Sequence, residues 1–137
     1  MAGDAPDRVV PIGSAADIVS ARQEGRALAS RLGFSSGDLT VIATAISEVA
    51  RNLLEYAGGG EIRLSLCQQG GRLGVCVVAC DKGPGIPDVQ KALRDGYSTH
   101  KGLGLGLPGA RRLMDEFEIV SEVGSGTTVT MKKWAGY

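Results

Sequence analysis

The stretch Ser47-Glu48-Val49-Ala50-Arg51-Asn52 places a carboxylate and a carboxamide four residues apart within a long helical pattern. On an α-helix this spacing puts Glu48 and Asn52 one turn apart on the same face, so both side chains can reach one pocket. The apolar residues Ile42, Ile46, Val49 and Leu53 recur at helical spacing and form a stripe about 100° away around the helix. The polar pair therefore flanks a helix face that we expect to be buried.

These two side chains suit phosphoryl transfer. A magnesium ion that holds a triphosphate takes oxygen ligands, and a hydroxyl that attacks phosphorus needs a base in line with it. Asn52 can provide the ligand and Glu48 the base. An isolated pair at this spacing is more often a solvated helix edge, so the assignment depends on the rest of the chain. Arg51 lies on the other side of Glu48 around the helix, where we expect an exposed salt bridge outside the site.

Length and charge limit the possible classes of protein. The 137 residues fit one domain, residues 1–137, with residues 1–8 expected as a disordered tail. The 15 basic and 15 acidic residues cancel, so we expect neither a nucleic-acid nor a membrane partner. No apolar run has the length of a membrane span, and Asp4 and Asp7 lie where a signal peptide would be apolar. These features predict a cytoplasmic protein.

Cysteine and glycine usage carry separate information. The three cysteines, Cys67, Cys76 and Cys80, lack metal-ligand spacing and fall on segments that resemble strands. We therefore expect reduced core residues. The 21 glycines are about twice the average share, and their positions bear on function.

Periodicity and turn signals predict an alternation of strands and helices. Ser14 and Ser35 or Ser36 begin helices, and Gly33 and Gly58-Gly59-Gly60 end them. The expected elements are a terminal or edge strand at 8–12 that contains Pro11, helices at 14–32 and 36–56, a hairpin of strands 61–68 and 73–80, a short helix at 88–94, a helix at 108–116, and a hairpin of strands 117–122 and 127–133. This order predicts an α+β fold, a two-layer α/β sandwich with a mixed, mostly antiparallel sheet and helices on one face.

A first glycine loop follows the strand that should be central. In Asp81-Lys82-Gly83-Pro84-Gly85-Ile86 the aspartate begins at the end of an apolar strand, in a partly buried place. A buried carboxylate needs donors, and the exocyclic amine of adenine is one, while Gly83 and Gly85 allow the backbone to approach the flat ring. Asp81 is therefore our candidate for adenine recognition. Taken alone, this pattern is also a common turn.

A second glycine loop leads into a helix. Gly102, Leu103, Gly104, Leu105 and Gly106 alternate just before the helix expected near Pro108. Peptide N–H groups at a helix start bind anions, and glycine removes side chains that would block a phosphate. No Gly-Lys-Ser/Thr follows, so this is not a Walker A loop, and it does not match a Rossmann fingerprint.

Taken together, the helical Glu-x-x-x-Asn, the strand-end Asp-x-Gly-x-Gly, the Gly-Leu repeat and Gly-Ser-Gly-Thr-Thr at 124–128 resemble the GHKL ATPase superfamily, which includes gyrase, histidine kinases and MutL. The segments 45–52, 81–86 and 113–117 resemble its branch of serine kinases from bacterial stressosomes. The likeness spans about Asp17 to Trp134 and implies a Bergerat fold that binds ATP under a mobile lid.

The resemblance also implies roles for individual residues. Glu48 would be the catalytic base and Asn52 the magnesium ligand, and Asp81 and Thr127 would meet adenine. The ATP-binding set that it implies comprises Asn52, Asp81, Gly83, Gly85, Ile86, Thr99, Lys101, Gly102, Leu103, Gly104, Leu105, Gly106 and Thr127. Lys101 is expected to contact phosphate, whereas His100 is as consistent with a solvated loop.

The implied function is an ATP- and magnesium-dependent protein serine/threonine kinase that acts on STAS-domain antagonist proteins and then engages a downstream phosphatase or other regulator. The alternative is an anti-sigma factor kinase that sequesters a sigma factor according to its nucleotide. A detached histidine-kinase domain would need a phospho-acceptor helix with a histidine, which we do not find. A gyrase- or MutL-like motor would need transducer and dimerisation domains, which are also missing.

Overall fold

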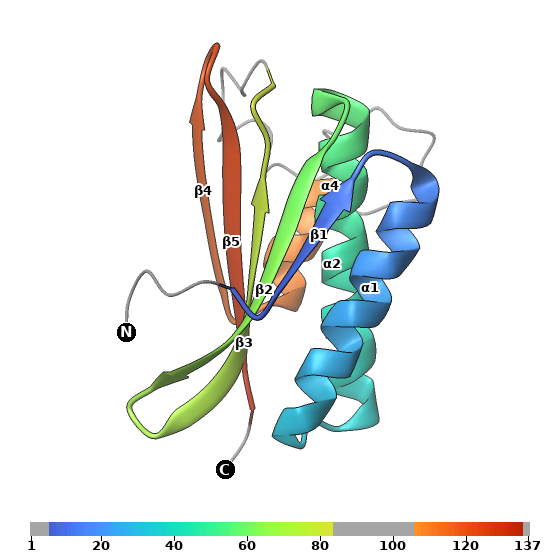
Figure 1. The fold of residues 1–137 in the computed structure, drawn as a ribbon. Coiled ribbons are helices and arrows are strands. Elements are labelled where there is room, and N and C mark those ends of the chain that lie inside the picture. Colours follow the sequence, from blue (N-terminus) through green and yellow to red (C-terminus); the bar gives the residue numbers. More distant parts are fainter. Residues whose placement is uncertain (1–5, 84–105, 136–137) are drawn as a thin grey trace.

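The computed structural model describes residues 6–83 and 106–135, which form one layer of helices packed on one sheet (Figure 1). In chain order the elements are β1 (Arg8–Ile12), α1 (Ala15–Ala29), a 3₁₀ turn (Ser30–Leu32), α2 (Ser36–Ala57), β2 (Gly60–Gln69), β3 (Arg72–Cys80), α4 (Gly106–Leu113), β4 (Glu116–Glu122) and β5 (Gly126–Trp134). No helix within these two ranges combines the length and apolar character needed to cross a bilayer.

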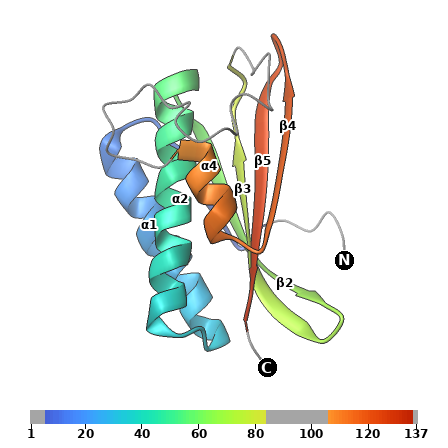
Figure 2. The ribbon, with the colours of Figure 1, turned by 180° about the vertical axis from the view of Figure 1, so that it is seen from behind.

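The five strands form one sheet in the order β1-β2-β3-β5-β4. All four ladders between the described strands are antiparallel, and β3 is the central strand, as its apolar sequence predicted. Helices α1, α2 and α4 lie on the same face of this sheet (Figures 1 and 2). The predicted α+β two-layer sandwich is confirmed, and the sheet, expected to be mixed, is antiparallel throughout its described strands.

The helix ends follow from local chemistry. The Ser35 hydroxyl accepts a hydrogen bond from the Asp38 N–H at 3.1 Å, which caps α2, and Gly58 ends the helix with φ of 75°. At α1 the Ser14 side chain makes no capping bond. Instead the Asp17 carboxylate accepts from the N–H of Gly13, the residue before the N-cap, at 2.8 Å, so the capping box expected from the sequence is not formed.

The first strand lies at an edge of the sheet, where Pro11 was expected. Among the described strands β1 pairs with β2 alone, so the missing N–H of Pro11 removes no bond from a second ladder there. Asp7, just before β1, accepts a hydrogen bond from the Leu66 N–H at 2.8 Å. Asp7 and Arg8 therefore belong to the folded domain, which shortens the tail predicted at 1–8; residues 1–5 lie outside the described residues.

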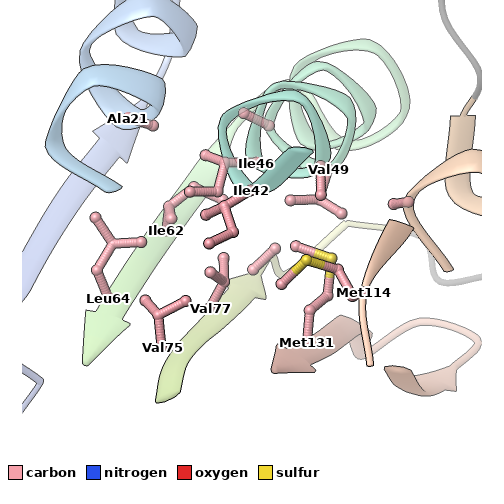
Figure 3. Close-up of a cluster of buried hydrophobic side chains, with 14 of the residues drawn as sticks. Ala21, Ile42, Ile46, Val49, Ile62, Leu64, Val75, Val77, Met114 and Met131 are labelled. Carbon is pink, nitrogen blue, oxygen red and sulfur yellow. The ribbon is translucent and has the colours of Figure 1, made fainter. Parts of the chain in front are cut away.

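The core lies between α2 and the inner face of the sheet (Figure 3). Ile42, Ile46 and Val49 of α2 are at most 1% exposed, which confirms the predicted stripe. They pack with fully buried side chains of the strands, Ile62, Leu64, Val75, Val77 and Met131. This packing fixes the rotation of α2, and so decides where its polar residues point.

The cysteines correct one expectation. They are free and half-buried, and they alternate along the strands with the core residues; in β3, for example, Cys76 lies between buried Val75 and Val77. The described helices cover one face of the sheet, and these side chains lie on the opposite face. Burial raises the pKa of the Cys67 and Cys76 thiols, so both remain protonated at neutral pH.

The boundaries of the last helix also differ from the prediction. α4 runs over Gly106–Leu113, whereas the sequence suggested 108–116, and Glu116 already begins β4. Gly106, at the first position, has φ of 66°, a left-handed conformation that glycine tolerates, and Pro108 lies in the first turn of the helix. The short helix predicted at 88–94 lies outside the described residues.

Candidate active site

Helix α2 carries the candidate base in a buried position. Glu48 is 8% exposed, and its two carboxylate oxygens have different partners. Oε1 accepts a hydrogen bond from the Gly106 N–H at 2.9 Å, and Oε2 accepts one from Arg51 Nη1 at 3.1 Å. A buried carboxylate is costly unless donors surround it. These two bonds therefore define the orientation of the Glu48 side chain.

The contact with Gly106 links two predicted features that lie 58 residues apart in the chain. Gly106 ends the Gly-Leu repeat and is the first residue of α4, which lies beside α2 on the helical layer (Figure 2). The N–H groups at the start of a helix attract negative charge, so a carboxylate is stabilised there. The structure thus brings Glu48 and the last glycine of the second glycine loop together.

Asn52 follows Glu48 by one turn of α2 and is half-buried. In residues 6–83 and 106–135 its side-chain amide has no hydrogen-bond partner. An amide with a carbonyl oxygen that is not in use, one turn from a buried carboxylate, suits a hard cation such as magnesium.

Asp81 forms a second polar centre where β3 ends. Its Oδ1 accepts from the Gly83 N–H at 2.8 Å and from the Thr127 N–H at 3.3 Å, and its own N–H donates to the Thr127 carbonyl at 3.0 Å. Among the described residues Oδ2 has no partner. One oxygen thus holds the loop and the other remains available to a donor such as an adenine amine.

Thr127 is 8% exposed and reaches Asp81 through its backbone. Its hydroxyl lies 2.8 Å from the hydroxyl of Ser121 on β4. The structure therefore gives Thr127 a place beside Asp81, and the side-chain contact with adenine that the resemblance implies stays a prediction.

Asp81, Gly83 and Thr127 together form what we call the Asp81 corner. Two glycines that the sequence analysis did not assign shape it. A Cβ on Gly126 would lie 2.2 Å from the Asp81 carbonyl oxygen, and one on Gly60 would lie 2.2 Å from the Cys80 carbonyl oxygen. Any side chain there would displace the backbone. Gly126 also has φ of 101°, which L-residues rarely adopt. The Gly-Ser-Gly-Thr-Thr pattern was a visible signal for Gly126; nothing in the sequence singled out Gly60 from its neighbours.

The two centres are related through α2. A Cβ on Gly83 would lie 2.8 Å from the Cβ of Ala57, the last residue of α2, so the loop after Asp81 packs on the end of that helix. Glu48 and Ala57 are separated by nine residues, about 14 Å along the axis at 1.5 Å per residue. The adenine candidate and the catalytic candidate thus lie at two points along one helix.

Arg51 is the residue that the sequence analysis misjudged. It was expected in an exposed salt bridge outside the site, but its partner is the candidate base itself, and that partner is buried. The three-residue spacing was the available signal, since such side chains are neighbours on a helix.

The remaining predicted contacts lie outside the described residues. These are Gly85, Ile86, Thr99, Lys101, Gly102, Leu103, Gly104 and Leu105, together with the open question of His100. Their assignment to the nucleotide stays a prediction.

Comparison with known proteins agrees with this geometry. Residues 13–133 match the family model of the histidine kinase-like ATPase domain. The serine/threonine-protein kinase RsbT of Bacillus subtilis is 52% identical over 118 residues, which cover 86% of this chain and 89% of that protein. The anti-sigma F factor of Geobacillus stearothermophilus is 32% identical over 120 residues, which cover 82% of this chain and 81% of that protein.

A solved structure supports the fold. The mycobacterial sensor histidine kinase MprB superimposes with a TM-score of 0.55 at 17% identity, covering 93% of this chain and 97% of that chain. At this low identity the similarity shows only that the two proteins share a fold. Because the family model spans most of the chain and the identity to the Bacillus kinase is high, the chain belongs to the histidine kinase-like ATPase family and is an RsbT-like serine/threonine-protein kinase.

Proposed function

We propose that this protein transfers phosphate from ATP, with magnesium, to a serine or threonine of a STAS-domain antagonist protein in a cytoplasmic partner-switching pathway, and then engages a downstream regulator such as a phosphatase. The observation that carries this proposal is the buried Glu48 carboxylate, one turn before Asn52 and hydrogen-bonded to the first N–H of α4. The 52% identity to a protein named as a serine/threonine kinase supports a hydroxyl acceptor.

The Asp81 corner fits the adenine end of ATP. The half-buried carboxylate has one oxygen satisfied by two backbone N–H groups, and within the described residues the other oxygen lacks a partner. A polar atom in such a place is costly unless a ligand or water supplies a donor. The amine of adenine is a suitable donor, and Asp81 is the residue to which we assign base recognition.

The α2 site fits a magnesium ion bound with the phosphates. Magnesium prefers oxygen ligands and commonly takes only one or two of them from the protein, the others coming from phosphate and water. Asn52 provides such an oxygen. The ion would neutralise the charge that develops on the phosphates during transfer.

Glu48 is suited to accept the proton of the attacking hydroxyl. The substrate oxygen would form a bond to the terminal phosphorus of ATP, the bond from that phosphorus to the bridging oxygen would break, and ADP would leave. The hydroxyl proton would go to Glu48, which requires Oε1 to exchange its bond with the Gly106 N–H for one with the substrate.

The experiment that tests this function offers radiolabelled ATP and magnesium to the purified protein together with STAS-domain proteins from the same genome. Labelled phosphoserine or phosphothreonine on one of them is the expected result. Label that appears on no STAS-domain protein, with a folded and ATP-binding kinase, would contradict the proposed substrate class.

The second candidate function is the sequestration of a sigma factor, because several anti-sigma F factors are 28% to 32% identical to the chain. The same preparation separates the two functions. A stable complex with a sigma factor in ADP or ATP would favour the anti-sigma function, and transfer to a STAS-domain protein without such a complex favours the switch kinase.

A further inference from the structure

The proposed function leaves Arg51 without a role, although it contacts the centre of the site. Its Nη1 lies 3.1 Å from Oε2 of Glu48, three residues earlier on α2. Within residues 6–83 and 106–135 this is the one hydrogen-bond partner found for the guanidinium. We infer that Arg51 is a positioning residue that orients the Glu48 carboxylate for proton removal, an inference that rests on the proposed role of Glu48.

The two hydrogen-bond donors to Glu48 come from different elements of the structure. The Gly106 N–H belongs to the start of α4, at the last glycine of the repeat assigned to the phosphates, and it occupies Oε1. Arg51 stands on the same helix as Glu48, so the distance between the two backbones is fixed by helix geometry. When Oε1 accepts the proton of a hydroxyl, the bond from Arg51 to Oε2 can persist. Arg51 can therefore hold the Glu48 carboxylate in place throughout the proton transfer.

The chemistry of guanidinium suits this task. It stays protonated at any working pH and donates in a fixed plane, so it holds one carboxylate oxygen and leaves the other with lone pairs toward the substrate. A lysine would retain the charge without the planar geometry. A glutamine side chain would retain a hydrogen-bond donor, but it is shorter than arginine and carries no charge. The three side chains should therefore rank Arg, Lys, Gln in their support of Glu48.

A direct contact of Arg51 with the phosphates is the competing role. The side chain is 36% exposed and its printed bond uses one of five N–H donors, so it has the means to reach a ligand. The two roles differ in their dependence on Glu48. A positioning residue loses its effect once the base is removed, whereas a phosphate contact keeps it. A double-mutant cycle measures this dependence.

The experiment measures single-turnover transfer at saturating Mg·ATP, using the acceptor identified by the labelling assay, for Arg51→Gln, Arg51→Lys, Glu48→Gln and the double variant Arg51→Gln/Glu48→Gln. We expect Arg51→Gln to lower the rate about 10- to 100-fold, as a misplaced catalytic group does. Lys should recover part of that loss, the affinity for Mg·ATP should change little, and the double variant should be no slower than Glu48→Gln. Losses that multiply in the double variant, or a wild-type rate in Arg51→Gln, would overturn the inference.

A readout without nucleotide complements the kinetics. If Arg51 orients Glu48, then Arg51→Gln should shift the NMR amide resonance of Gly106, because the acceptor of that N–H moves. Arg8→Gln is the matched control, since it removes an Arg–Glu ion pair of 2.9 Å between the edge strand β1 and helix α1. It should alter neither the Gly106 amide nor the transfer rate.

These outcomes also separate the inference from the proposed function. A Glu48→Gln protein that transfers phosphate at the wild-type rate would remove the base, and with it both claims. A slow Glu48→Gln protein together with an unaffected Arg51→Gln protein would leave the proposed function intact and reject the role of Arg51 alone.

Discussion

The two ends of the site are built by different means. At the Asp81 corner the carboxylate is held by backbone groups, the N–H groups of Gly83 and Thr127. Gly60 and Gly126 allow the neighbouring backbone segments to approach closely. At the Glu48 end, helix α2 carries the acid, its arginine partner and the amide, and in the part of the chain that the structure describes one backbone N–H from another element, that of Gly106, joins them.

This difference suggests a division of labour. A carboxylate fixed by backbone from two strands is suited to recognise a rigid group such as a purine. Side chains on one helix, with one bond to a distant segment, can exchange partners during a reaction. Substitutions should therefore be able to change nucleotide affinity and phosphate transfer independently of each other.

The largest effect is expected at the base. Glu48→Gln keeps the size of the side chain but cannot accept the hydroxyl proton, so transfer should fall by roughly 10²- to 10⁴-fold, the usual contribution of a positioned base. Mg·ATP affinity, measured by isothermal titration, should stay nearly constant. A parallel loss of affinity would show that the two ends are not separable.

Gly126→Ala should have the next largest effect, on the Asp81 corner. The new Cβ would meet the Asp81 carbonyl oxygen at 2.2 Å, at a φ of 101°. Strain and overpacking each cost about 1–3 kcal/mol, so urea unfolding should report a loss of roughly 2–6 kcal/mol, with weaker ATP binding in the protein that stays folded.

Gly124→Ala is its matched control in the same turn. Gly124 also has a positive φ, of 85°, but a Cβ there would meet no atom of the described residues within 4 Å. It should cost only the backbone strain, about 1–2 kcal/mol, and leave ATP affinity unchanged in the folded protein. Equal effects of the two substitutions would mean that the close approach to Asp81 is unimportant.

Asp81→Asn should weaken the adenine end selectively. The amide keeps the shape but loses the charge, and a hydrogen bond to a charged group is worth about 1.5–3 kcal/mol, or roughly 10- to 100-fold in affinity. Because Asp81 is assigned to the adenine ring and not to the phosphates, adenosine and ATP should lose affinity equally in titration calorimetry. Unchanged binding of both would reject the assignment.

Asn52→Ala should give the smallest effect, at the phosphate end. The loss of one neutral ligand should weaken Mg·ATP about 10-fold, on the scale of a single polar interaction, and leave adenosine unaffected. Excess magnesium should recover part of the affinity by mass action. A deficit that does not respond to magnesium would point to a different role for Asn52.

Much of the fold was predictable because its signals are local. The period of Ile42, Ile46 and Val49 defined the buried face of α2, and Gly58 marked its end. The cysteines were placed wrongly in the core because an apolar run does not reveal which faces of a sheet are covered. The end of α4 was misjudged because Asp115 and Glu116 do not by themselves stop a helix.

The site was predictable to the extent that spacing alone determines it. Glu48 and Asn52 followed from one helical turn, and Asp81 from the end of a strand. The role of Gly60 depends on which carbonyl lies opposite it, a contact across the β2–β3 ladder that no local pattern shows. The Arg51–Glu48 bond was missed because the angular position of Arg51 was judged without the reach of its long side chain.

The pairing of β3 with β5 has a consequence for folding rates. A two-residue turn at Gly70-Gly71 closes the β2–β3 hairpin, whereas the contact between Asp81 and Thr127 closes a loop of 46 residues. Closing long loops is entropically slower, so we expect the Asp81 corner to form after the transition state. A nucleotide that binds there would then slow unfolding and leave the refolding rate almost unchanged. Stopped-flow measurements with and without ADP would test this, and a refolding rate that rises with ADP would place the corner in the folding nucleus.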